Sequence, residues 1–309
     1  MNEVIPPGGQ PEGSPPSPSI SAPSMRTLEE RRGLLYVVLA VFFFSTSPVL
    51  TRWAAPLSPY EIATGRLAVA ALSILILMAL RRECLHVSRA DWPRFIGFGL
   101  IAAAHFLCYI ASLSYTTIAH SLSIVYTAPI FVTLFSALLL KEPIPRRKWG
   151  GVIVAVIGVA ILAGFEPRLN RTMLWGDLLA LGSAITFGLY SVAGRSQRAH
   201  YPLFTYAAAV YGLGALWMLP VAAVNFTPSG YTLIPVLSVI GLGILPLGFG
   251  HTLYNAALRR AHATYVNLIA TQEVTGGILL GMLLLGEMPG INEVVGAVVT
   301  LAGIALVVL

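Results

Sequence analysis

Residues 126–163, YTAPIFVTLFSALLLKEPIPRRKWGGVIVAVIGVAILA, are two apolar spans joined by a short loop. Residues 271–308, TQEVTGGILLGMLLLGEMPGINEVVGAVVTLAGIALVV, repeat the pattern. Aligning Glu142 with Glu287 (287 − 142 = 145) also pairs Gly158 with Gly303. Further upstream, the same offset pairs Tyr109 with Tyr254. These matches indicate a tandem duplication of one apolar unit.

The composition excludes an ordinary soluble domain. Hydrophobic residues make up 56% of the 309 residues and charged residues only 10%, whereas soluble domains carry about 25% charged residues. After Gly33, apolar runs long enough to cross a bilayer fill the chain. The composition therefore predicts an all-α membrane protein, because helices satisfy their own backbone hydrogen bonds in lipid.

We expect ten transmembrane helices arranged as two five-helix repeats, residues 33–164 and 174–309. The expected spans are 34–54, 60–80, 92–113, 119–140, 149–164, 174–194, 203–224, 233–258, 263–285 and 293–309. Residues 1–32 are predicted to form a disordered cytoplasmic tail, because their first 24 residues are rich in Pro, Gly and Ser. That tail lacks the pattern of a signal peptide, so the first span is expected to direct insertion.

The Lys and Arg residues predict the orientation. With the N-terminus in the cytoplasm, fifteen of the nineteen fall in the N-terminal tail and the cytoplasmic loops and three fall outside, while Arg66 lies within a span. This bias predicts that both termini are cytoplasmic. Basic residues confined to short loops argue against a nucleic-acid partner, despite the net charge of +6.

Because each repeat has an odd number of spans, the second should be inverted relative to the first. Inverted repeats around a site at the membrane midplane are characteristic of secondary transporters. The pattern therefore favours transport by alternating access around a central cavity. An enzyme has no comparable need for this symmetry.

Polar and aromatic side chains within the spans are the candidates for this cavity. Glu273 lies about ten residues into its span, where an ionisable group is costly. It would bind a substrate amine or carry a proton, or else be a neutral residue fixing helix packing. His105 and His251 are candidate proton carriers, or neutral residues bridging helices. Aromatic residues are candidates for the cavity wall, each with packing as its alternative: Tyr109, Phe187, Tyr190 and Tyr254.

Other residues within the spans favour structural roles. Arg66 is interpreted as reaching the outer interface or pairing with Glu61. Pro129 and Pro246 are expected to kink their helices. Glycines of the fifth and tenth spans are expected to allow close helix packing: Gly150, Gly151, Gly158, Gly296 and Gly303.

Several kinds of chemistry have no sequence motif here. There is no phosphate-binding loop, no dinucleotide fingerprint and no paired-His metal motif. Cys84 and Cys108 have neither metal-ligand spacing nor the pattern of a disulfide framework. We therefore expect no cofactor, no metal and no catalytic residues.

The duplicated ends, TAPIFVTLFSALLLKEPIPRRKWGGVIVAVIGVAIL and EVTGGILLGMLLLGEMPGINEVVGAVVTLAGIAL, resemble ten-helix drug/metabolite transporters of the EamA type. The segments SLSYTTIAHSLSIVYTAPIF and FGLYSVAGR are similar to those of YddG-like amino-acid exporters of bacterial inner membranes. The resemblance implies a basket of helices with spans 3, 4, 8 and 9 central and spans 5 and 10 peripheral. It also implies export of amino acids and related metabolites.

Some individual residues match the family pattern and others depart from it. Glu273 matches a glutamate of the family, but Val274 stands where a proline often follows. His105, Ala128 and Phe187 stand where aromatic exporters carry Tyr and Trp, which implies a broader substrate range.

Together these features predict a secondary transporter in the bacterial inner membrane that exports amino acids and small metabolites. We expect it to act as a monomer in the bilayer, with protons as candidate partners. The alternatives are export of cationic drugs or nucleotide sugars, an intramembrane enzyme using His105, His251 and Glu273, and a lipid-facing scaffold. An enzyme requires converging catalytic groups, and a scaffold would tolerate replacement of the central polar residues.

Overall fold

The computed structural model describes residues 28–140, 146–164, 170–197, 200–258, 260–261, 266 and 269–308. Throughout these residues the regular structure is helical. Residues 1–27 of the expected disordered tail lie outside them. Its last residues, 28–32, were assigned wrongly, because they begin helix α1 and Arg32 donates to Glu29 across one turn, at 2.9 Å.

The helices follow one another with short connections. The first half contains α1 (Leu28–Ser45), α2 (Ser47–Trp53), α3 (Pro59–Leu80), η1 (Arg89–Asp91), α4 (Trp92–Tyr115), α5 (Ile118–Val125), α6 (Ala128–Leu140) and α7 (Arg146–Gly164). The second half contains α8 (Arg171–Gln197), α9 (Leu203–Val224), η2 (Pro228–Gly230), α10 (Leu233–Leu242), η3 (Gly243–Gly250), α11 (His251–Leu258), α13 (Glu273–Leu285) and α14 (Ile291–Val308).

Seven helical segments among the described residues are long and apolar enough to cross a membrane. They are Leu28–Trp53, Pro59–Leu80, Arg89–Tyr115, Ile118–Leu139, Arg171–Gly194, Leu203–Val224 and Leu233–Ala257. Three shorter apolar helices are Trp149–Ile161, Glu273–Leu285 and Ile291–Val307. An α-helical membrane protein is thus confirmed, while the count of ten spans stays a prediction.

Several expected spans are interrupted near their centres. The expected span 34–54 breaks at Thr46, just before Pro48, and the span 119–140 breaks at Tyr126, just before Pro129. Pro246 lies inside η3, a π-helical segment within the span 233–258. Each proline lacks the backbone N–H that an unbroken helix would use, and the chain departs from regular α-helix beside both prolines that were expected to kink their helices, Pro129 and Pro246.

One further interruption has no proline. Thr271 and Gln272 form a turn, and α13 begins only at Glu273. The sequence predicted that Glu273 lies in the middle of a helix. In the structure it lies at the start of one. Thr271 and Tyr126 are 145 positions apart (271 − 126 = 145). The two copies are thus interrupted at equivalent positions.

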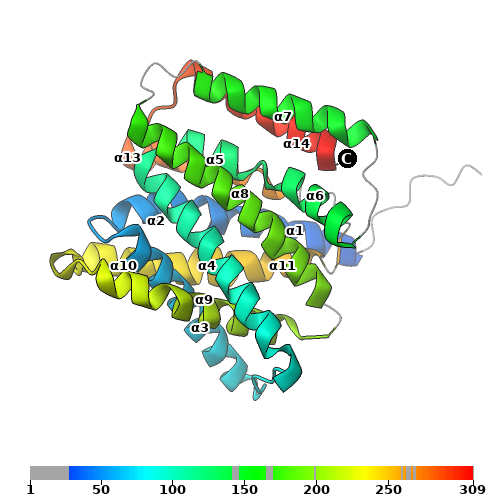
Figure 1. Cartoon of the computed structure of the whole chain (residues 1–309), viewed down its shortest axis with the longest axis vertical. Coiled ribbons are helices and arrows are strands. Elements are labelled where there is room, and N and C mark those ends of the chain that lie inside the picture. The colour runs from blue at the N-terminus through cyan, green and yellow to red at the C-terminus, as the bar shows by residue number, and fades with distance from the viewer. Residues whose placement is uncertain are drawn as a thin grey trace, which may run out of the picture.

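The helices form a main body and a flanking pair. Figure 1 shows α7 and α14 side by side along the top edge, with α8 and α4 crossing the front of the main body. One buried apolar cluster joins α3, α4 and α9, and includes Leu67, Phe95, Phe106 and Tyr211. A second cluster surrounds α5 and includes Ile110, Leu122 and Val274. These clusters hold the broken helices against their neighbours.

Glycines bring α7 and α14 into close contact. A Cβ atom on Gly151 would lie 2.7 Å from the carbonyl oxygen of Gly303, and one on Gly158 would lie 2.8 Å from the Cα of Thr300. Both distances are too short for a side chain. By contrast, a Cβ on Gly150 would have no atom within 4 Å. The close packing expected from these glycines is confirmed for Gly151, Gly158 and Gly303, but not for Gly150.

This contrast gives a matched prediction. Gly158→Leu should lower the thermal stability of the purified protein, with a loss of about 2 kcal/mol from overpacking. Gly150→Leu adds the same side chain to the same helix but meets open space, so its unfolding temperature should stay near that of the wild type. Equal unfolding temperatures for the two variants would contradict the packing described for α7 and α14.

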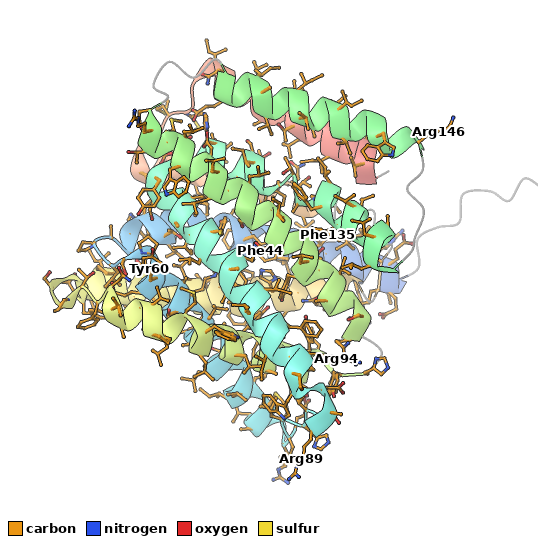
Figure 2. The ribbon with its side chains drawn as sticks, in the orientation of Figure 1. Phe44, Tyr60, Arg89, Arg94, Phe135 and Arg146 are labelled. Carbon is orange, nitrogen blue, oxygen red and sulfur yellow. The ribbon has the colours of Figure 1, made fainter. Side chains whose placement is uncertain are left out.

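Basic residues mark one end of several helices. Figure 2 shows Arg89 and Arg94 at the lower end of α4 and Arg146 at the beginning of α7, while Tyr60 lies at the opposite side of the molecule. By the charge bias this basic end would face the cytoplasm. We call the opposite end, which holds residues 54–58 and 286–290, the outer end.

Candidate functional site

A cavity lies where the interrupted helices meet. About 750 Å³ of space between atoms, including space open to solvent, lies among its lining side chains. Its lining comes from both halves of the chain: Phe44, Arg66, His105, Phe106, Tyr109, Val125, Tyr126, Ala128, Pro129, Phe187, Pro246, His251, Tyr254, Ala270, Thr271 and Glu273. The walls are thus largely aromatic, with a few polar groups set among them.

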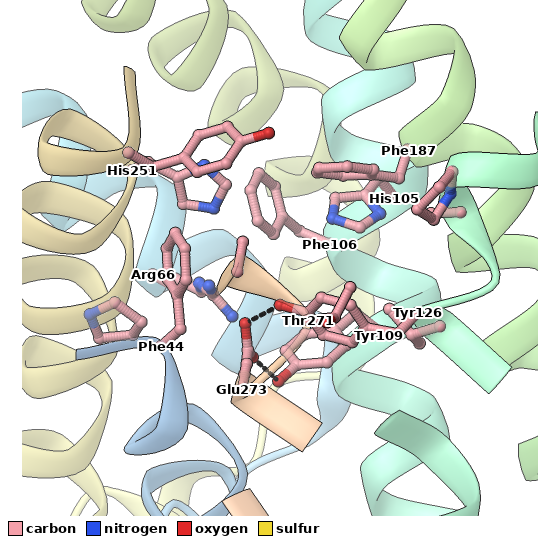
Figure 3. A pocket seen from close by; sticks show the side chains of 16 residues that line it. Phe44, Arg66, His105, Phe106, Tyr109, Tyr126, Phe187, His251, Thr271 and Glu273 are labelled. Atoms are coloured by element: carbon pink, nitrogen blue, oxygen red, sulfur yellow. Dashed lines mark hydrogen bonds between the residues drawn. The ribbon is translucent and has the colours of Figure 1, made fainter. Parts of the chain in front are cut away.

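Glu273 projects into this cavity from the first turn of α13 (Figure 3). Tyr109 donates a hydrogen bond to its Oε1 atom at 3.4 Å, and Tyr126 donates to its Oε2 atom. The side chain is buried, with the residue 8% exposed. The interruptions at Tyr126 and before Glu273 thus bring the two copies together at one carboxyl group.

Arg66 lies in the same cavity, which corrects the interpretation made from the sequence. It does not pair with Glu61. Glu61 instead caps α3 at Ser58, and its Oε1 atom accepts hydrogen bonds from the Thr227 backbone N–H at 2.9 Å and the Tyr231 hydroxyl at 3.0 Å. Arg66 is buried, 3% exposed, and points inward.

The two histidines occupy opposite sides of the cavity, as Figure 3 shows. His105 Nδ1 is 3.0 Å from the carbonyl oxygen of Ser183 on α8, and its ring centroid is 5.0 Å from that of Phe187. The ring of His251 is 5.0 Å from that of Phe44, in an edge-on arrangement. His105 is therefore fixed by a backbone contact, whereas His251 is positioned by aromatic neighbours.

Six of the seven residues proposed from the sequence line this one cavity: His105, Tyr109, Phe187, His251, Tyr254 and Glu273. Tyr190 is not part of its lining. It lies just behind it, with its ring 6.4 Å from that of His105 and its hydroxyl 3.4 Å from that of Tyr211. The structure therefore brings the proposed residues together, and their role in binding a substrate stays a prediction.

A second polar cluster lies at the outer end, and sequence reasoning missed it. Seven residues from both halves form this outer network: Arg52, Thr116, Thr117, His120, Asp177, Glu287 and Glu293. Each lies near the end of a helix, where a polar residue is unremarkable in the sequence. Only the fold shows that they meet.

One part of the outer network centres on His120, which is fully buried on α5. Its Nδ1 atom is 3.0 Å from Asp177 Oδ2 on α8, and its Nε2 atom is 3.8 Å from Glu293 Oε1 on α14. Thr116 donates to Asp177 at 2.8 Å, and Thr117 donates to Glu293. Buried carboxylates in lipid need such partners.

The other part centres on Glu287, which follows α13. It accepts the backbone N–H of Ile118 at 2.6 Å and pairs with Arg52 Nη2 at 3.2 Å. Arg52 also donates to the carbonyl oxygens of Leu113 and Thr116. The outer network therefore ties α2, α4 and α5 of the first half to α8, α13 and α14 of the second.

These features define the class of protein. Ionisable side chains in a central cavity, reached by interrupted membrane helices from two related halves, are the features of a solute transporter. The sequence profile of the EamA-like transporter family matches residues 31–164 and again residues 174–309. The chain belongs to this family.

Characterised and uncharacterised relatives agree with this assignment. The chain is 32% identical over 229 residues to the pseudopaline exporter CntI of Pseudomonas aeruginosa, covering 72% of this chain and 79% of the relative. It is 26% identical over 254 residues to an uncharacterized transporter of Archaeoglobus fulgidus, covering 82% of this chain and 89% of that protein. A solved crystal structure with 21% sequence identity shares the fold, with a TM-score of 0.65, covering 89% of this chain and 95% of that one.

No group of three or more His, Cys, Asp or Glu side chains suited to a metal ion occurs within the part of the chain that the structure describes.

Proposed function

We propose that this protein is a secondary transporter that exports amino acids and related small metabolites across the bacterial inner membrane by alternating access. The observation that carries the proposal is the cavity at which both interrupted copies meet, with Glu273 and Arg66 in its walls. Export, rather than uptake, is supported by the similarity to the pseudopaline exporter CntI of Pseudomonas aeruginosa. Both termini would be cytoplasmic, as the charge bias predicts.

The proposed architecture is ten membrane helices in two inverted five-helix repeats. Three observations support it: seven long and three shorter apolar helices, a family profile that matches twice, and interruptions at equivalent positions in the two copies. A repeat of five crossings reverses its direction in the membrane. The two domains would be residues 33–164 and 174–309, acting together as a monomer.

Alternating access requires that each end of the cavity opens in turn. In this structure the outer network joins both halves at the outer end. We infer that these contacts separate when the site opens outward and re-form when it opens to the cytoplasm. New contacts with solvent and with the bound solute would offset the free energy lost when these contacts separate.

The alternatives to amino-acid export are two other substrate classes and one other class of protein. The cavity's aromatic walls and Glu273 would also suit a cationic drug, and nucleotide sugars are the other transported class to compare. An intramembrane enzyme is disfavoured because Glu273 is held by Tyr109 and Tyr126, while His105 contacts a backbone carbonyl. Among the described residues, no hydrogen bond joins either histidine to Glu273.

Counterflow in proteoliposomes tests the proposed function. Vesicles containing the purified protein are loaded with an unlabelled amino acid, and entry of the labelled form is followed with and without a pH gradient. Saturable entry above protein-free vesicles is expected, and gradient dependence would add protons as a coupled partner. Entry of drugs or nucleotide sugars but of no amino acid would overturn the proposed substrate class.

A further inference from the structure

Arg66 is a buried cation that makes no ion pair with the described residues. Its residue is 3% exposed, and the described part of the chain places no carboxylate within the 4.0 Å of an ion pair to its nitrogens. Its Nε atom is buried and has no hydrogen-bond acceptor among the described residues. Leaving a charged donor unpaired at membrane depth is costly.

The guanidinium is nevertheless held in a defined position. Nη1 donates to the hydroxyl of Ser47 at 3.1 Å. The Cζ atom lies 4.8 Å from the ring centroid of Phe106 and 5.5 Å from that of Tyr109. Ser47 is thus the hydrogen-bond partner of Nη1. The Nε and Nη2 atoms together form a different edge of the guanidinium. A carboxylate binds that pair side-on, through two parallel hydrogen bonds.

Glu273 supplies the opposite charge in the same cavity. Figure 3 shows the Arg66 guanidinium and the Glu273 carboxyl group facing the same space. Both oxygens of Glu273 are engaged by tyrosine hydroxyls, whereas Arg66 keeps its Nε atom unpaired. A solute with one negative and one positive group would match this arrangement.

We propose that Arg66 binds the carboxylate of the transported solute, with its amine directed to Glu273. The substrate class is therefore amino carboxylates rather than cations or neutral solutes. This inference rests on the proposed function, because it assigns a subsite of the same transport cavity. It also explains why Arg66 is buried here without an ion pair to a carboxylate of the described residues.

Binding of paired probes to the purified full-length protein in nanodiscs tests the assignment. One pair is phenylalanine and phenylalaninamide, and the other is 3-phenylpropionate and 3-phenylpropanamide, which lack an amine. Phenyl groups suit the aromatic walls, and each amide removes only the carboxylate charge. Wild-type protein should prefer each carboxylate by roughly 10- to 100-fold, the usual value of a hydrogen bond to a charged group.

The variants separate a binding role from a structural one. Arg66→Gln should abolish the preference in both pairs, and Arg66→Lys should retain part of it by keeping the charge. Arg94→Gln is the matched control, since Arg94 is exposed on α4, and it should behave as the wild type. If Arg66→Gln does not yield folded protein, Arg66→Lys still tests the proposal. Lysine keeps the charge but cannot form two parallel hydrogen bonds with a carboxylate, so the preference for the carboxylate probe over its amide should be reduced.

The outcomes also separate this inference from the proposed function. A carboxylate preference that survives unchanged in Arg66→Gln or Arg66→Lys would overturn the role of Arg66, even if amino acids are transported. An Arg66-dependent preference for 3-phenylpropionate, in a protein that moves no amino acid in counterflow, would support the carboxylate subsite and remove the proposed amino-acid substrate.

Discussion

Glu273→Gln should reduce amino-acid counterflow by roughly 10- to 100-fold, while the purified protein stays folded. Glutamine keeps the size of the side chain, and its amide can accept a hydrogen bond from one of Tyr109 and Tyr126 while donating one to the other hydroxyl. It removes the charge that would bind a substrate amine, a contribution of about 1.5–3 kcal/mol in a charged hydrogen bond. Initial rates in proteoliposomes, with the quantity of inserted protein measured, check this.

Gln272→Ala is the matched control, because Gln272 is the neighbouring residue but is exposed. It should transport at the wild-type rate. If a pH gradient drives wild-type transport, Glu273→Gln should also lose that dependence. Normal transport by Glu273→Gln, with the same dependence on pH, would remove both roles from this residue.

Asp177→Ala should lower the stability of the protein by several kcal/mol, because Asp177 is a buried member of the outer network. Asp177 accepts hydrogen bonds from Thr116 and from His120, which is fully buried. Its removal leaves two buried donors without their acceptor, and each such donor costs about 1–3 kcal/mol. Thermal unfolding followed by tryptophan fluorescence in a fixed detergent measures the change.

Glu83→Ala removes an exposed carboxylate from the loop after α3 and serves as the control. Its unfolding temperature should match that of the wild type. The account would be contradicted if Asp177→Ala unfolded at the same temperature as Glu83→Ala, because the outer network would then hold nothing together.

The membrane fold and most of the cavity follow from simple features of the sequence. Long apolar runs predict helices in a bilayer, and the duplicated pattern predicts two related halves. Within such runs, ionisable groups are rare and costly, so Glu273, His105 and His251 stood out, and the structure places all three in the cavity lining. Prolines indicated two of the interruptions.

Arg66 was misread because proximity in sequence was taken for proximity in space. Helical neighbours that meet are three or four residues apart, whereas Glu61 and Arg66 are separated by five. Glu61 therefore faces the outer loop at Thr227, while Arg66 faces Ser47. Helical spacing alone would have separated the two residues, although it could not have placed Arg66 beside the cavity.

Other features depend on contacts between distant segments. His120, Asp177 and Glu293 come from three different helices, and each alone looks like a polar residue near a helix end. The interruption at Thr271 has no proline, and its only signal is the equivalence to Tyr126 in the other copy. Such features require the tertiary structure.

Protection from alkylation tests directly whether the transported solute occupies this cavity. Ala270 lines the cavity, so Ala270→Cys is introduced together with Cys108→Ala, while the exposed Cys84 stays as an internal control. Modification of each cysteine by a maleimide is followed by mass spectrometry. The account predicts that a transported amino acid slows labelling at position 270, with half protection near its half-saturating concentration in counterflow, and leaves Cys84 unaffected. Equal labelling at position 270 with and without a saturating solute would contradict it.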